Sequence, residues 1–145
     1  ATSPARMPAV TYSAWVKPLS YLGVAWVLAQ YPDWGWSRGI TLNDQRLGGT
    51  GVTAGGQYTS GLGNLPLNKW SHVVGVWTSQ GSGTWSPCWI YVKDPQEGQF
   101  SSHERTCKNG QRKDDVEEKL VIGGRMPDDQ RHNPKVLVTD VAVWN

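Results

Sequence analysis

The chain has 145 residues, of which 38% are apolar and 18% charged, with a formal net charge of +2. That length suits one domain, residues 1–145, with its own core, and the apolar content is too high for a disordered chain. The charge is too mild to predict a nucleic-acid partner, which needs a clustered basic face. No stretch approaches the roughly 18 apolar residues of a membrane span, so we expect no membrane insertion.

The composition favours strands over helices. Glycine (17) and proline (9) are frequent, and nine tryptophans are many for a chain of this size. Gly and Pro at such frequencies are typical of short strands joined by turns. Trp and Tyr combine an apolar ring with a polar group, which suits half-buried faces and binding surfaces.

Strand candidates follow one another through the first half of the chain. Each shows alternation of apolar and polar residues or enrichment in β-branched residues, and each is bounded by turn residues. In chain order they are residues 11–17, 23–30, 36–42, 51–54 and 57–60.

The second half opens with the strongest candidate, residues 70–78, a nearly continuous apolar run. Such a run is typical of a central strand buried on both faces. Residues 89–93 are expected to form its hairpin partner, and the polar stretch 94–119 is expected to be a long surface excursion. Residues 120–122 and 136–144 complete nine strands with no convincing helix, which predicts an all-β sandwich.

Five segments, in this order, resemble strands of the laminin-G-like (concanavalin A-like) jelly-roll family. They are residues 12–18 (YSAWVKP), 70–77 (WSHVVGVW), 89–94 (WIYVKD), 120–124 (LVIGG) and 138–145 (VTDVAVWN). Together they extend over almost the whole chain. The sequence departs from the family after residue 94, where Pro95 replaces a common turn glycine and a long insertion follows.

This resemblance implies an antiparallel β-sandwich with the concanavalin A-like jelly-roll topology. Members of the family are mostly adhesion and glycan-binding modules, often appended to secreted enzymes, and several bind one calcium ion at the rim of the sandwich. The resemblance therefore implies a lectin-like domain of a secreted or cell-surface protein. A fold is shared by many functions, so the chemistry of individual residues must decide between binding and catalysis.

Two cysteines, Cys88 and Cys107, lie in turn-rich stretches. On adjacent hairpin arms they would pair and close a loop, which contributes about 3 kcal/mol to stability. We expect this disulfide, and with it an extracellular or cell-surface location. The alternative is two free thiols in a reducing compartment.

Groups suited to catalysis or metal binding are sparse. Glucanases of this sandwich use a pair of carboxylates, and the nearest candidate pair is Asp115 and Glu117. Basic residues flank that run, which favours a solvated loop, so we expect no enzyme, no catalytic residue and no required cofactor. Asp128 and Asp129 are candidate calcium ligands, although exposed turn acids are the simpler interpretation.

The binding signal is aromatic. Residues 31–38 (YPDWGWSR) bring three rings, an acid and an arginine together at a turn, and Trp85 is expected in a second loop. Sugar rings stack their C–H faces on Trp and Tyr, while polar groups bind the hydroxyls in a concave site. The candidate ligand-binding residues are Tyr31, Asp33, Trp34, Trp36, Arg38 and Trp85. The alternative is that the loop tryptophans cap the ends of the sandwich. Five other tryptophans are expected in the core: Trp15, Trp70, Trp77, Trp89 and Trp144.

These residues predict a non-catalytic carbohydrate-binding module, in a calcium-assisted or a calcium-independent form. Aromatic stacking would supply the affinity, and charged groups would orient the glycan. The alternative is a protein-interaction or structural adhesion domain of a larger assembly, in which the same aromatic side chains anchor a protein interface.

Overall fold

The computed structural model describes residues 9–20, 25–31, 38–44, 49–54, 57–60, 62–78, 85–93, 100–108, 119–123 and 135–144. These residues form strands and no helix, which confirms the all-β prediction. The strands are β1 (Ala9–Pro18), β2 (Ala25–Tyr31), β3 (Gly39–Asp44), β4 (Gly49–Ala54), β5 (Gln57–Ser60), β6 (Ser71–Thr78), β7 (Trp85–Lys93), β8 (Phe100–Lys108), β9 (Lys119–Ile122) and β10 (Val136–Trp144).

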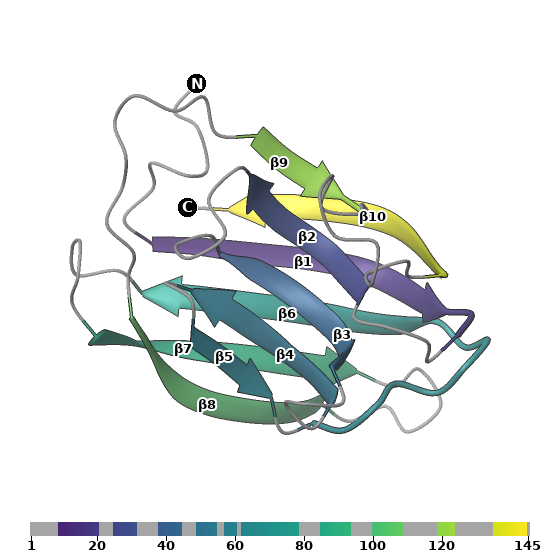
Figure 1. Cartoon of the computed structure of the whole chain (residues 1–145), viewed down its shortest axis with the longest axis horizontal. Coiled ribbons are helices and arrows are strands. Elements are labelled where there is room, and N and C mark those ends of the chain that lie inside the picture. The colour runs from purple at the N-terminus through teal and green to yellow at the C-terminus, as the bar shows by residue number, and fades with distance from the viewer. Residues whose placement is uncertain are drawn as a thin grey trace.

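The strands form two five-stranded antiparallel sheets (Figure 1). Sheet I has the strand order β10-β1-β6-β7-β8, and sheet II has the order β5-β4-β3-β2-β9. In sheet I, β1 lies between β6 and β10. The first and last strands therefore pair with each other in one sheet. This arrangement places residues from distant parts of the sequence side by side on one surface.

The alternation of buried and partly exposed side chains in β1 shows which face of sheet I is buried. One set of alternate residues is fully buried and points toward sheet II: Val10, Tyr12, Ala14 and Val16. Thr11, Trp15 and Lys17 occupy the other face and are partly exposed. This is the period-two pattern of a strand with one buried face, and β6 shows it too.

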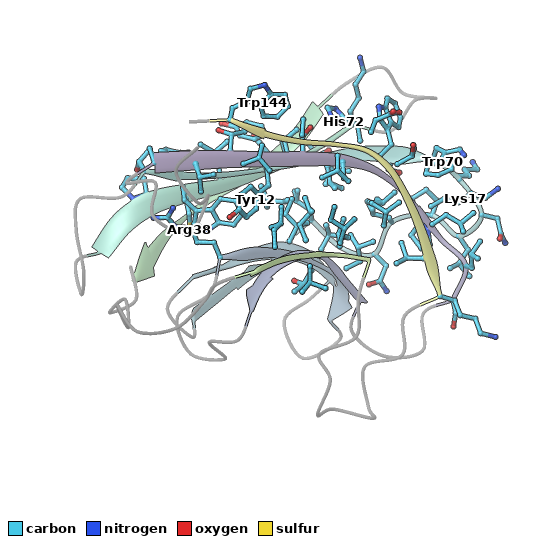
Figure 2. The ribbon with its side chains drawn as sticks, turned by 90° about the horizontal axis from the view of Figure 1, so that it is seen from above. Tyr12, Lys17, Arg38, Trp70, His72 and Trp144 are labelled. Carbon is cyan, nitrogen blue, oxygen red and sulfur yellow. The ribbon has the colours of Figure 1, made fainter. Side chains whose placement is uncertain are left out.

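The core lies between the two sheets. Across it β2 contacts β1 and β10, β3 contacts β6, β4 contacts β7, and β5 contacts β8. Figure 2 shows this two-layered, sandwich-like arrangement from the side, with Tyr12 pointing between the layers. The rings of Tyr12 and Trp77 lie 5.0 Å apart with an interplanar angle of 58°, a tilted geometry that aromatic pairs favour.

All nine strands predicted from the sequence are present, with ends that differ by a few residues. The predicted hairpin partnership is confirmed by the antiparallel pairing of β6 with β7. The surface excursion predicted for residues 94–119 is wrong over β8, which pairs with β7 along its whole length. The expectation that residues 70–78 are buried on both faces is also wrong, because alternate residues of β6 are only half-buried.

Candidate functional site

The outer faces of the two sheets differ in how far they are covered. In sheet II, Ile40 and Leu42 of β3 are fully buried, and Thr41 between them, which points to the other side, is 1% exposed. Both faces of that strand are therefore covered. In sheet I the outward-facing side chains of β6 and β7 keep contact with solvent. The open face of sheet I is the candidate site.

We call this surface the outer face and define it by the side chains of sheet I that point away from sheet II. On β1, β6, β7 and β10 its partly or fully exposed side chains include Thr11, Trp15, Lys17, His72, Val74, Val76, Trp89, Tyr91, Lys93, Leu137, Thr139 and Trp144. Ser13 of β1 points to the same side but is only 3% exposed. Figure 2 shows His72 and Trp144 on this side of the sheet, opposite Tyr12. Trp15, Trp89, Tyr91 and Trp144 make the outer face rich in aromatic rings.

One row of the outer face combines a ring stack with a cation. Pairing across three strands places Trp15, His72 and Lys93 side by side. The rings of Trp15 and His72 lie 5.2 Å apart and are stacked, with an interplanar angle of 23°. Burial lowers the pKa of His72 from its ordinary value, and the charge of Lys93 lowers that pKa further. The imidazole is thus held toward its neutral form, as a ring that extends the indole surface.

A second row carries two more tryptophans. Trp144 pairs with Thr11, Thr11 with Val76, and Val76 with Trp89. Because neighbouring strands are about 4.8 Å apart, the backbones at Trp144 and Trp89 are roughly 14 Å apart. Trp144 is 51% exposed. Tyr91 lies two residues beyond Trp89 on the same face, roughly 7 Å away.

Four of the five tryptophans that were expected in the core lie elsewhere. Trp77 is 1% exposed and belongs to the core, whereas Trp70 and Trp144 are 36% and 51% exposed. Trp15 and Trp89 are half-buried on the outer face. That expectation was therefore wrong for Trp15, Trp70, Trp89 and Trp144, and the open aromatic face was missed. Their alternation with core residues was visible in the sequence, but an uncovered outer side was not.

Among the predicted ligand-binding residues, three lie within the described part of the chain. Tyr31 is the last residue of β2, where it pairs with Lys119, and Arg38 is half-buried just before β3. Figure 2 shows Arg38 between the two layers, at the end of the sandwich where β1 begins. Trp85 is the first residue of β7, paired with Lys108, so its predicted position in a loop is wrong.

The remaining predicted ligand-binding residues, Asp33, Trp34 and Trp36, lie outside the described residues. The strand that was expected to include Trp36 begins at Gly39. The structure therefore describes only the two ends of the predicted aromatic cluster. Tyr31 ends β2, Arg38 directly precedes β3, and these two strands pair with each other.

Cys88 is fully buried on the core side of β7 and is disulfide-bonded. Cys107, the other cysteine of the sequence, belongs to β8. The register pairs Cys88 with Arg105 and Ser86 with Cys107, so the two cysteine positions are diagonal neighbours on one side of sheet I. The bond therefore lies at the core side, away from the outer face.

Candidate catalytic and metal-binding acids are not placed by the structure. Asp115, Glu117, Asp128 and Asp129 lie outside the described residues. Within the described ranges, no three His, Cys, Asp or Glu side chains come close enough to hold a metal ion. The same ranges contain no helix that is long and apolar enough to cross a bilayer.

No protein-family model matches the sequence, and no curated protein matches it.

Proposed function

We propose that this chain is a non-catalytic carbohydrate-binding module of a secreted or cell-surface protein, built as a concanavalin A-like jelly roll. The outer face of sheet I is its binding surface. The observation that carries this proposal is the presence of Trp15, Trp89, Tyr91 and Trp144 on one partly exposed face of sheet I.

The surface matches the chemistry of a glycan in two ways. Pyranose rings present flat C–H faces, and aromatic side chains supply large rigid surfaces at low entropic cost. Hydroxyl groups need hydrogen-bond partners, and the exposed Thr139 and Asp140 of β10 lie beside the aromatic rows. The residues come from ordered strands, so little conformational entropy is lost when a ligand binds.

Replacing single tryptophans tests the site. Trp144→Ala and Trp89→Ala are each expected to weaken glycan binding at least tenfold, about 1.4 kcal/mol, because central aromatic side chains dominate binding interfaces. The measurement is a glycan-array screen of the purified domain, followed by titration calorimetry of the best ligand. The screen is run with calcium and again with a chelator, which separates the calcium-assisted form from the calcium-independent one.

Trp70→Ala is the matched control, because Trp70 is also an exposed tryptophan but lies just before β6, beyond both rows. It is expected to leave glycan affinity unchanged. A saccharide ligand whose affinity is indifferent to Trp144 and Trp89 would move the site to the predicted loop cluster that contains Trp34. An empty array, together with stoichiometric recovery of a protein partner, would replace this proposal by the protein-interaction alternative.

A further inference from the structure

One end of sheet I differs from the rest of the outer face in its exposed residues. Here β1 ends while β6 and β10 begin. We call this region the basic end and define it by Lys17, Leu19, Lys69, Trp70, Lys135 and Leu137. It contains three lysines and three large apolar side chains, and each lysine lies within two residues of an apolar one.

Backbone contacts hold the three segments of the basic end together. The amide of Leu19 donates a hydrogen bond to the carbonyl of Lys135 (2.7 Å), and the amide of Asn68 donates one to the carbonyl of Pro18 (2.8 Å). In the β1–β10 ladder Lys17 stands directly opposite Leu137. Figure 2 shows Lys17 and Trp70 at the same end of the molecule. These contacts hold the three segments of the basic end next to one another at one end of sheet I.

The apolar side chains of the basic end are unusually accessible. Leu19 is 38% exposed, Trp70 36% and Leu137 47%, and they are three of the five large apolar residues that are exposed in the described part of the chain. A cluster of exposed large apolar groups signals a contact with another apolar phase. Their concentration at one end requires an explanation that scattered surface residues do not.

The charge of the basic end is positive. The segments 17–19, 69–70 and 135–137 contain three lysines and no acidic residue. The next acid along β10 is Asp140, which lies three residues beyond Leu137 at a bulge opposite Ser13 and Trp15. The ligand of this surface must therefore combine negative charge with an apolar layer.

We propose that the basic end docks onto the surface of an anionic lipid bilayer. Lysines near such a surface are attracted by its negative potential, and Trp is favoured at the boundary between headgroups and acyl chains. The two leucines then contact the outer part of the acyl layer. An acidic glycan would satisfy the lysines and stack on Trp70, but it leaves Leu19 and Leu137 without a role.

Docking of this kind involves surface side chains only. No strand enters the bilayer, so it is distinct from the membrane-spanning segment that the sequence excludes. The basic end shares Lys17 and Leu137 with the outer face, but it does not include the tryptophans and the tyrosine of the two aromatic rows. Trp144 pairs with Thr11 near the start of β1, whereas Lys17 lies near its end. The inference does not rest on the proposed glycan-binding function, and each can fail alone.

The test is co-sedimentation of the purified domain with two kinds of vesicle, one of phosphatidylcholine alone and one of phosphatidylcholine with phosphatidylserine. Binding is expected only with the mixed vesicles, and it is expected to weaken as salt is added. The double variant Lys17→Gln/Lys135→Gln should lower the partition coefficient roughly 25-fold, because each lysine near an anionic surface is worth about a fivefold factor. Trp70→Ser should weaken binding while the unfolding midpoint stays unchanged.

Two controls separate the basic end from the rest of the molecule. Lys119→Gln removes a lysine that pairs with Tyr31 at the far end of β2, and Trp144→Ser removes an exposed tryptophan of the glycan surface. Both should leave vesicle binding unchanged. The proposal is overturned by equal binding to both kinds of vesicle or by no binding to either. It is also overturned if a soluble sulfated polysaccharide binds through Lys17 and Lys135 while the mixed vesicles do not.

Discussion

At the scale of single residues, His72 is the side chain of the outer face whose protonation makes stability depend on pH. It stacks on Trp15, and the charged groups that face it are Lys93 on β7 and Lys17, the next outward residue on β1. Tyr91 lies nearby on β7, and no described acid stands beside the imidazole. Burial and Lys93 therefore act in the same direction and lower the pKa of His72.

This shift makes stability depend on pH with a definite sign. The unfolded chain binds the proton of His72 near its ordinary pKa of 6.5, whereas the folded protein binds it only at lower pH. Unfolding then takes up a proton, so the free energy of unfolding falls as the pH drops below about 6.5 and levels off below the folded pKa. Urea unfolding of the wild type and His72→Gln between roughly pH 7.5 and pH 5 checks this. The wild type should lose more stability than the variant, and equal losses would contradict the prediction.

The residue scale also shows what alternation can and cannot reveal. Because Trp15 lies between Ala14 and Val16, the sequence predicts that its side chain faces away from theirs. Whether that opposite face is covered depends on which segments pack over it, and alternation contains no information on this. The same holds for Val74 and Val76, because an apolar residue on a half-buried outer face cannot be distinguished from a core residue by its type.

At the scale of elements, the missed strand β8 has a physical explanation. Its sequence FSSHERTCK is mostly polar, and β8 is an edge strand of sheet I that pairs only with β7. Charged residues on edge strands discourage pairing with other molecules, and they also hide the period-two pattern that identifies a strand. The apolar strands β1, β6 and β10 were predictable because one buried face imposes alternation or an apolar run.

A close approach of two backbones fixes the start of β4. Gly49 has a φ of 118° and forms a bridge with Gly63, and the amide of Thr50 donates a hydrogen bond to the carbonyl of Gly63 (2.7 Å). A Cβ atom at Gly49 would lie 2.6 Å from the Cα of Gly63. Only glycine accommodates both this φ and this contact.

Gly49→Ala is therefore expected to lower the free energy of unfolding by about 3 kcal/mol, from the left-handed backbone and the clash together. Gly63→Ala is the matched variant. Its φ is 67°, but a Cβ there meets no atom within 4 Å, so only the conformational cost of about 1–2 kcal/mol applies. Denaturant unfolding of both variants measures the difference, and a Gly63 variant as unstable as the Gly49 variant would exclude the backbone clash as the cause.

At the scale of the whole molecule, the fold divides its aromatic residues between stability and surface. Tyr12 and Trp77 fill the layer between the sheets, whereas Trp70 and Trp144 lie on the other side of sheet I (Figure 2). Both groups come from strands of sheet I or from the residue next to one, so one sheet supplies a core face and a binding face. The division requires that nothing in the folded chain covers the second face.

Comparison of one tryptophan from each group tests that division. Trp77→Ala should lower the free energy of unfolding by about 3–5 kcal/mol, because the fully buried ring leaves a cavity. That is a large share of the 5–15 kcal/mol typical of a domain. Trp144→Ala should change it by no more than about 0.5 kcal/mol, since the side chain is half exposed. Chemical denaturation at one pH measures both. A large loss for Trp144→Ala would mean that the outer face supports the fold, and it would remove the basis for a ligand there, because a side chain that the protein itself buries offers no surface to a glycan.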